Sequence, residues 1–195
     1  MTGVAALVAG LALFLGTHSV RIFADDWRAA RIAAMGEGAW KGVYSLLSLA
    51  GLALLVWGYG QSRADPLVLW TPPAGLSHVA ALLTLPAFVL VTAAYVPMNH
   101  IRAAVGHPMV AGVKLWAFAH LLCNGRLGDV LLFGAFLAWA VLDFVAARRR
   151  DRAAGHRQAD GRAGRTVVTV VAGVVAWGVF AFHLHAVVVG VRPFG

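Results

Sequence analysis

Residues 4–23 read VAALVAGLALFLGTHSVRIF, an apolar run in which Arg21 is the first charged side chain. A helix needs ~20 consecutive apolar residues to cross the hydrocarbon core of a bilayer. The whole chain shares this character, because 61% of its residues are hydrophobic, 12% are charged and its mean hydropathy is +0.78. A soluble domain needs more polar surface than this. The sequence therefore predicts an all-α, polytopic integral membrane protein.

Six apolar runs predict a bundle of about six transmembrane helices in a single domain, residues 1–195. The expected spans are 4–23, 39–59, 76–96, 108–124, 127–147 and 166–189. Because further runs follow the first and no Lys or Arg precedes it, we expect a retained helix, not a cleaved signal peptide. Pro108 suits the first turn of the fourth span, and Asn124–Gly125 is a helix-stop signal. This span is the shortest, so a short helix, a tilted helix and a partly re-entrant element all remain open.

The basic residues predict how the spans are oriented. Seven of the sixteen Lys and Arg residues lie between Arg148 and Arg165, and the loops after the first and third spans are also basic. The positive-inside rule places these three loops in the cytoplasm and both termini on the outer, periplasmic side of a bacterial inner membrane. Residues 148–165 are expected to form a mobile Arg-rich loop that does not bind nucleic acid. The only cysteine, Cys123, excludes an intrachain disulfide and a Cys-based metal cluster.

Eight histidines are many for a chain with so few charges. Ionisable residues within a membrane usually face the bundle interior and indicate function, although a neutral histidine can simply bond to a neighbouring helix. Two histidines on separate helices can ligate a haem iron axially, and helix bundles commonly house such cofactors. His18 on the first span and His120 on the fourth are the best-placed pair, so they are predicted axial ligands of a haem iron.

Neighbours on the same helical faces extend this hypothesis. Phe14 and Arg21 share the face of His18 by their i, i+4 and i+3 spacing. An apolar ring contact is expected from Phe14, although ordinary helix packing also explains it, and a haem propionate is the expected partner of Arg21. Arg102 and Lys114 are further candidate partners for a propionate, while snorkelling to the interface is the simpler interpretation of Lys114.

On the fourth span, Trp116, His120 and Asn124 lie on one face in the same way. Trp116 is expected to contact the cofactor ring, with ordinary packing as the alternative, and Asn124 completes the predicted cofactor face.

Other polar residues give weaker signals. His183 and His185 are two residues apart, so they point in roughly opposite directions, and at most one faces the core. Together with His78 they would form an outer polar site. Neither a nucleotide-binding loop nor HExxH spacing is present. His156 is expected to be solvated, and Asp143 lies near the inner end of the fifth span.

The motifs LGTHSVRI, NHIRAAVGHPMVAGVKLWAFAHLLCNG and HLHAVVVGVRPFG, in this order, resemble the NnrU family over nearly the whole chain. The resemblance implies a link to nitrite and nitric oxide metabolism in denitrification. The family is also similar to the plant 15-cis-zeta-carotene isomerase, which implies haem b and a redox-controlled isomerase-like activity on a lipophilic substrate. Its haem histidines correspond by motif to His18 and His120, while His107 and His185 are further motif positions.

Three functions follow as hypotheses. The first is a haem-b-binding membrane protein acting in nitrogen-oxide or isomerase-like chemistry. The second is a non-enzymatic factor that assists the assembly or maturation of a nitric oxide reductase, whose components would be its partners. The third is a small-solute transporter, with a polar path from His78 and His185. A proton-coupled version is disfavoured by the scarcity of acids within the spans.

Overall fold

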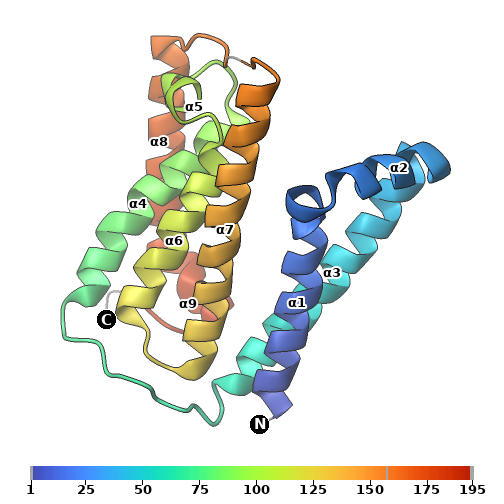
Figure 1. The fold of residues 1–195 in the computed structure, drawn as a ribbon. Helices are drawn as coiled ribbons and strands as arrows, with labels where there is room; N and C mark the ends of the chain where they lie inside the picture. Colours follow the sequence, from blue (N-terminus) through green and yellow to red (C-terminus); the bar gives the residue numbers. More distant parts are fainter. Residues whose placement is uncertain (1, 157, 194–195) are drawn as a thin grey trace. The chain divides into compact units, whose positions relative to one another are not determined.

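The computed structural model describes residues 2–156 and 158–193, so Arg157 of the Arg-rich segment and both chain ends fall outside it. Most of the described residues are helical (Figure 1). The helices are α1 (Thr2–Phe23), α2 (Asp25–Met35), α3 (Glu37–Ser62), α4 (Leu76–Tyr95), α5 (His100–Val105), α6 (Pro108–Cys123), α7 (Leu127–Ala153), α8 (Ala163–Val179), the π-helical turn η1 (Phe180–Leu184) and α9 (His185–Val189).

Five helical segments are long and apolar enough to cross a membrane: α1, α3, α4, α7 and the continuous segment Ala163–Val189. They coincide with five of the six expected spans, which confirms an all-α, multi-pass membrane protein. The sixth expected span is α6, a helix of 16 residues. It begins at Pro108 and ends at Cys123 beside Asn124, as predicted, but it is shorter than the ~20 residues that a straight crossing requires.

Three segments expected to be loops contain helix, one of them the connection after the third expected span, which contains α5. The connection after the first span forms α2, where Asp25 and Asp26 occupy the first turn, the position that favours acids. The predicted loop 148–165 is also shorter than expected. Its first six residues extend α7 to Ala153, because Ala and Arg are strong helix formers, and α8 already begins at Ala163. The prediction that the whole segment is a loop was therefore wrong.

The helices group into two compact units. The first comprises α1, α2, α3 and the beginning of α7, up to Trp139. In this unit α1 and α3 lie side by side (Figure 1). Gly51 of α3 sets how closely they approach, because a Cβ there would lie 2.7 Å from the Phe14 backbone nitrogen. Close packing at small residues such as glycine is a common way in which membrane helices associate.

The second unit contains α4, α5, α6, the remainder of α7, and α8 to α9. Within it α4 packs against both α6 and α8 (Figure 1). Gly112 on α6 allows the close approach to α4, since a Cβ there would lie 2.8 Å from the Ala87 carbonyl oxygen. Most valines of α8 remain exposed, as suits a lipid-facing surface.

Candidate functional site

His18 lies near the end of α1, half-buried in the first unit. Its Nδ1 is 2.7 Å from the carbonyl oxygen of Phe14, one helical turn earlier. A carbonyl oxygen only accepts, so Nδ1 carries the proton and donates it. In the neutral ring the lone pair therefore lies on Nε2. This is the nitrogen and the tautomer that suit a metal ligand.

Aromatic rings surround His18. Its centroid lies 4.3 Å from that of Phe14, 5.3 Å from Tyr44 of α3 and 6.1 Å from Trp139 of α7, the last in a T-shaped arrangement. Phe136 in turn contacts Phe14 at 6.0 Å. The contact of Phe14 with a cofactor ring stays a prediction, and in the structure the Phe14 ring packs against His18 and Phe136. The other three aromatic residues were missed, because they lie on helices that the sequence does not pair.

Two buried polar atoms in the first unit have no hydrogen-bond partner among the described residues: the Ser48 hydroxyl oxygen and the Trp139 indole nitrogen Nε1. Ser48 lies one turn along α3 from Tyr44, and the Trp139 ring contacts His18. Buried polar atoms in proteins nearly always have a partner, so each such exception calls for an explanation. A bound group with hydrogen-bonding atoms would supply one.

His120 occupies an equivalent local setting on α6 in the second unit. Its Nδ1 is 2.9 Å from the carbonyl oxygen of Trp116, and the two rings lie 5.1 Å apart. By the same reasoning Nδ1 is the donor and the Nε2 position carries the lone pair. Asn124 bonds to the backbone of the same helix. Its amide donates to the carbonyl oxygen of His120 at 2.9 Å and so caps the end of α6.

The two predicted haem ligands thus share one arrangement. In each case an aromatic residue precedes the histidine by four positions, accepts a hydrogen bond from Nδ1 through its carbonyl oxygen, and packs against the imidazole. Arg21, which shares the helical face of His18 and is the predicted partner of a propionate, lies exposed in the last turn of α1.

Unlike His18 and His120, His107 has a carboxylate as its partner. Its Nε2 lies 2.9 Å from the Asp151 carboxylate, and its ring meets Phe144 edge-on at 6.3 Å. The ammonium of Lys114 sits 3.9 Å from the centre of the same Phe144 ring, which is a cation–π contact. His107 therefore holds the entrance of α6 to the end of α7. This contact is one that the sequence could not indicate.

The outer histidines differ in their surroundings. His185 donates from Nδ1 to the Val191 carbonyl oxygen at 2.6 Å, while His183 and His78 are exposed. Of His183 and His185, only His185 is half-buried, which agrees with the prediction that at most one of them faces the core. Across residues 2–156 and 158–193, no group of three or more His, Cys, Asp or Glu side chains is placed to hold a metal ion.

One buried acid was overlooked. Asp129, in the first turn of α7, is only 4% exposed and accepts a hydrogen bond from the Tyr59 hydroxyl at 2.7 Å. Acids are common in the first turn of a helix, so the sequence alone does not distinguish this one. Asp143 is also paired, 3.8 Å from Arg150.

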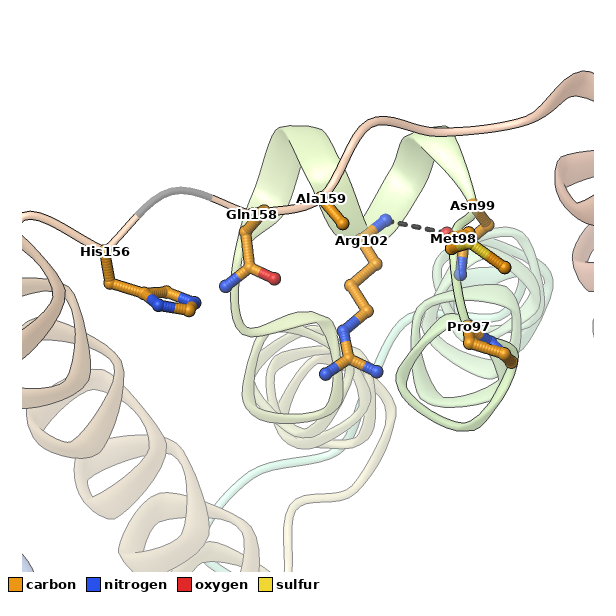
Figure 2. Close-up of a pocket in the computed structure, with 7 residues that line it drawn as sticks. All are labelled: Pro97, Met98, Asn99, Arg102, His156, Gln158 and Ala159. Atoms are coloured by element: carbon orange, nitrogen blue, oxygen red, sulfur yellow. Dashed lines mark hydrogen bonds between the residues drawn. The ribbon is translucent and has the colours of Figure 1, made fainter.

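A pocket opens at the end of the second unit where α4 and α8 meet the loops. It is lined by Pro97, Met98, Asn99, Arg102, His156, Gln158 and Ala159 (Figure 2). His156, expected to be merely solvated, is one of its walls. Arg102, expected near a haem propionate, extends into this pocket.

Comparison with known proteins identifies one family. The family described as NnrU protein matches residues 6–193. No curated protein matches the chain, and no solved structure does.

Proposed function

Since the chain belongs to the NnrU family, we propose that it is a haem-b-binding protein of the bacterial inner membrane, with a role in nitrite and nitric oxide metabolism. His18 and His120 are the proposed axial ligands. The observation that carries the proposal is their shared geometry, in which Nδ1 is committed to a backbone carbonyl and Nε2 is left as the coordinating nitrogen.

This geometry matches what metal-binding histidines require. Such histidines almost always donate their other ring N–H to a carbonyl or carboxylate, which fixes the tautomer and the ring orientation. For His18 and His120 the acceptor lies on the same helix, so the orientation is set locally. The stacked rings of Phe14 and Trp116 restrict each imidazole further.

The surroundings of His18 also fit a large apolar group. Phe14, Tyr44 and Trp139 offer aromatic faces, which suit a porphyrin. The unpartnered Ser48 hydroxyl and Trp139 Nε1 would hydrogen-bond its polar atoms. Ligation of a haem iron needs one or two side chains, so it does not depend on a larger cluster of ligands.

Haem would supply reversible electron transfer and an iron that binds small molecules such as nitric oxide. The protein's own contribution would be to fix both ligands, to exclude water from the iron and to neutralise a propionate through Arg21. A redox-controlled, isomerase-like activity on a lipophilic substrate is part of the same proposal, since it would use the same ligands. Assembly of a nitric oxide reductase is the alternative role.

The test is the absorption spectrum of detergent-purified protein after expression with added haem precursor. We expect a six-coordinate, low-spin haem b spectrum in the wild type, and loss of that spectrum in both His18→Ala and His120→Ala. His183→Ala is the matched control, because His183 is an exposed histidine of another predicted span. Wild-type protein that stays colourless refutes haem binding, and a low-spin spectrum that survives in either ligand variant refutes the ligand pair.

A further inference from the structure

The pocket of Figure 2 combines cationic and apolar walls. Arg102 comes from α5, and His156 and Gln158 come from the segment between α7 and α8. Met98 and Ala159 add apolar surface. Figure 2 shows Arg102 between the His156–Gln158 side and the Met98 side, with its guanidinium extending into the pocket. The cavity measures about 350 Å³, which accommodates a small polar headgroup.

One wall of the pocket is held by the side chain of Asn99, whose amide nitrogen and oxygen both form hydrogen bonds. Asn99 is completely buried, and its Nδ2 donates to the carbonyl oxygens of Ala93 and Val96, at 2.9 and 2.5 Å. Its Oδ1 accepts from the Arg102 backbone nitrogen at 2.7 Å, the dashed line in Figure 2. Asn99 therefore fixes the position of Arg102 and leaves recognition of an occupant to other groups.

Arg102 has donors to spare. Of the five N–H groups of a guanidinium, one donates to a described residue, from Nη1 to the Ala94 carbonyl oxygen at 3.2 Å. Among residues 2–156 and 158–193, no carboxylate pairs with Arg102. Two acids on α7 are held by other bases, Asp143 at 3.8 Å from Arg150 and Asp151 at 2.9 Å from His107. Asp160, which follows the lining residue Ala159, is exposed and has no ion pair with a described residue. Within the described residues the pocket is therefore cationic and lacks an internal counter-ion.

The position of the pocket indicates the source of a counter-ion. Residues 97–102 directly follow α4, and residues 156–159 shortly precede α8; both helices belong to candidate membrane spans. A site at the ends of spanning helices lies at the level of the lipid headgroups. This end of the unit also carries a cluster of arginines: Arg148, Arg149, Arg150, Arg152, Arg162 and Arg165. Clusters of this size next to spanning helices attract anionic lipids.

We propose that this pocket binds the phosphate of an anionic lipid headgroup, with Arg102 as its principal ligand. The phosphate would accept hydrogen bonds from the Arg102 guanidinium, and the His156 ring and the Gln158 amide would complete the shell. Met98 and Pro97 would contact the glycerol and the first methylenes. This site is independent of the proposed haem ligands, since it shares no residue with them.

The test measures lipid binding to the full-length protein in detergent at 150 mM salt, where diffuse surface attraction is largely screened. The probes are phosphatidylglycerol, phosphatidylcholine and inorganic phosphate, and bound lipid is counted by native mass spectrometry. We expect Arg102→Gln to weaken phosphatidylglycerol binding roughly tenfold, as for a lost charged hydrogen bond. Arg152→Gln, the matched control, removes an exposed charge outside the pocket and should change it by less than about twofold.

Equal losses in the two variants would overturn the proposal, because they would show a diffuse electrostatic effect. Equal affinity for phosphatidylcholine would overturn it as well. Inorganic phosphate that binds as tightly as the lipid would overturn the lipid as its source. His156→Ala controls for misfolding of Arg102→Gln, because among the described residues the hydrogen bond of His156 is made by its backbone N–H, to the Asp151 carbonyl oxygen. It should also weaken phosphatidylglycerol binding, and unchanged binding in a folded His156→Ala protein would count against the site.

Discussion

The packing of α1 on α3 gives the sharpest prediction about what holds the His18 site together. In Gly51→Ala the new Cβ would lie 2.7 Å from the Phe14 nitrogen, 2.9 Å from its Cα and 3.1 Å from its Cβ. Ordinary van der Waals contact begins at 3.4 Å, so the two backbones must separate by several tenths of an ångström. No rotamer change relieves this overlap, because two of the three atoms belong to the backbone.

Gly42 supplies a matched control on the same helix. A Cβ at Gly42 would meet nothing within 4 Å. Both substitutions gain the same helix propensity of alanine, roughly 0.5–1 kcal/mol. Only Gly51→Ala carries a cost of overpacking, about 1–3 kcal/mol. The free energies of unfolding of the two variants should therefore differ by about 1–3 kcal/mol, with Gly42→Ala the more stable.

The assay is reversible unfolding of the purified variants by a denaturing detergent, followed by tryptophan fluorescence and circular dichroism. Equal unfolding free energies, within about 0.5 kcal/mol, would refute the close approach of the two helices, since propensity would then be the only effect. If haem is bound, Gly51→Ala should also reduce its retention, because Phe14 holds the His18 ring through its carbonyl oxygen.

Three further predictions concern the remaining contacts and the orientation. Tyr59→Phe should destabilise the protein by about 1–3 kcal/mol in the same assay, because it removes a hydrogen bond to the buried Asp129 carboxylate. Tyr59→Phe in an Asp129→Ala background, which lacks the acceptor, should cost clearly less, and an equal cost in both backgrounds would deny the bond. A double-mutant cycle of His107→Gln and Asp151→Asn should give a coupling of about 0.5–1 kcal/mol, as for a partly exposed pair; additive effects would show that the pair contributes nothing. A reporter enzyme that works only outside the cytoplasm should be active when it is fused to either terminus, as the positive-inside rule predicts. Activity of a reporter that works only in the cytoplasm would show the opposite orientation.

Local sequence predicted the five long apolar helices, and where the fourth expected span begins and ends. Apolar runs of sufficient length predicted α1, α3, α4, α7 and the segment from α8 to α9, because crossing a bilayer is a requirement on composition and length. The helical spacing also placed Phe14 beside His18 and Trp116 beside His120, since residues four apart on one helix are neighbours whatever surrounds them.

Tertiary structure alone decided the partners that come from other helices. The ring contacts of His18 with Tyr44 and Trp139 depend on how α1, α3 and α7 pack, and no pattern in one helix encodes that. The same holds for the pairing of His107 with Asp151, 44 residues away. Apolar composition decides which segments enter the membrane, whereas it is packing at a few small residues such as Gly51 that selects which polar side chains meet there.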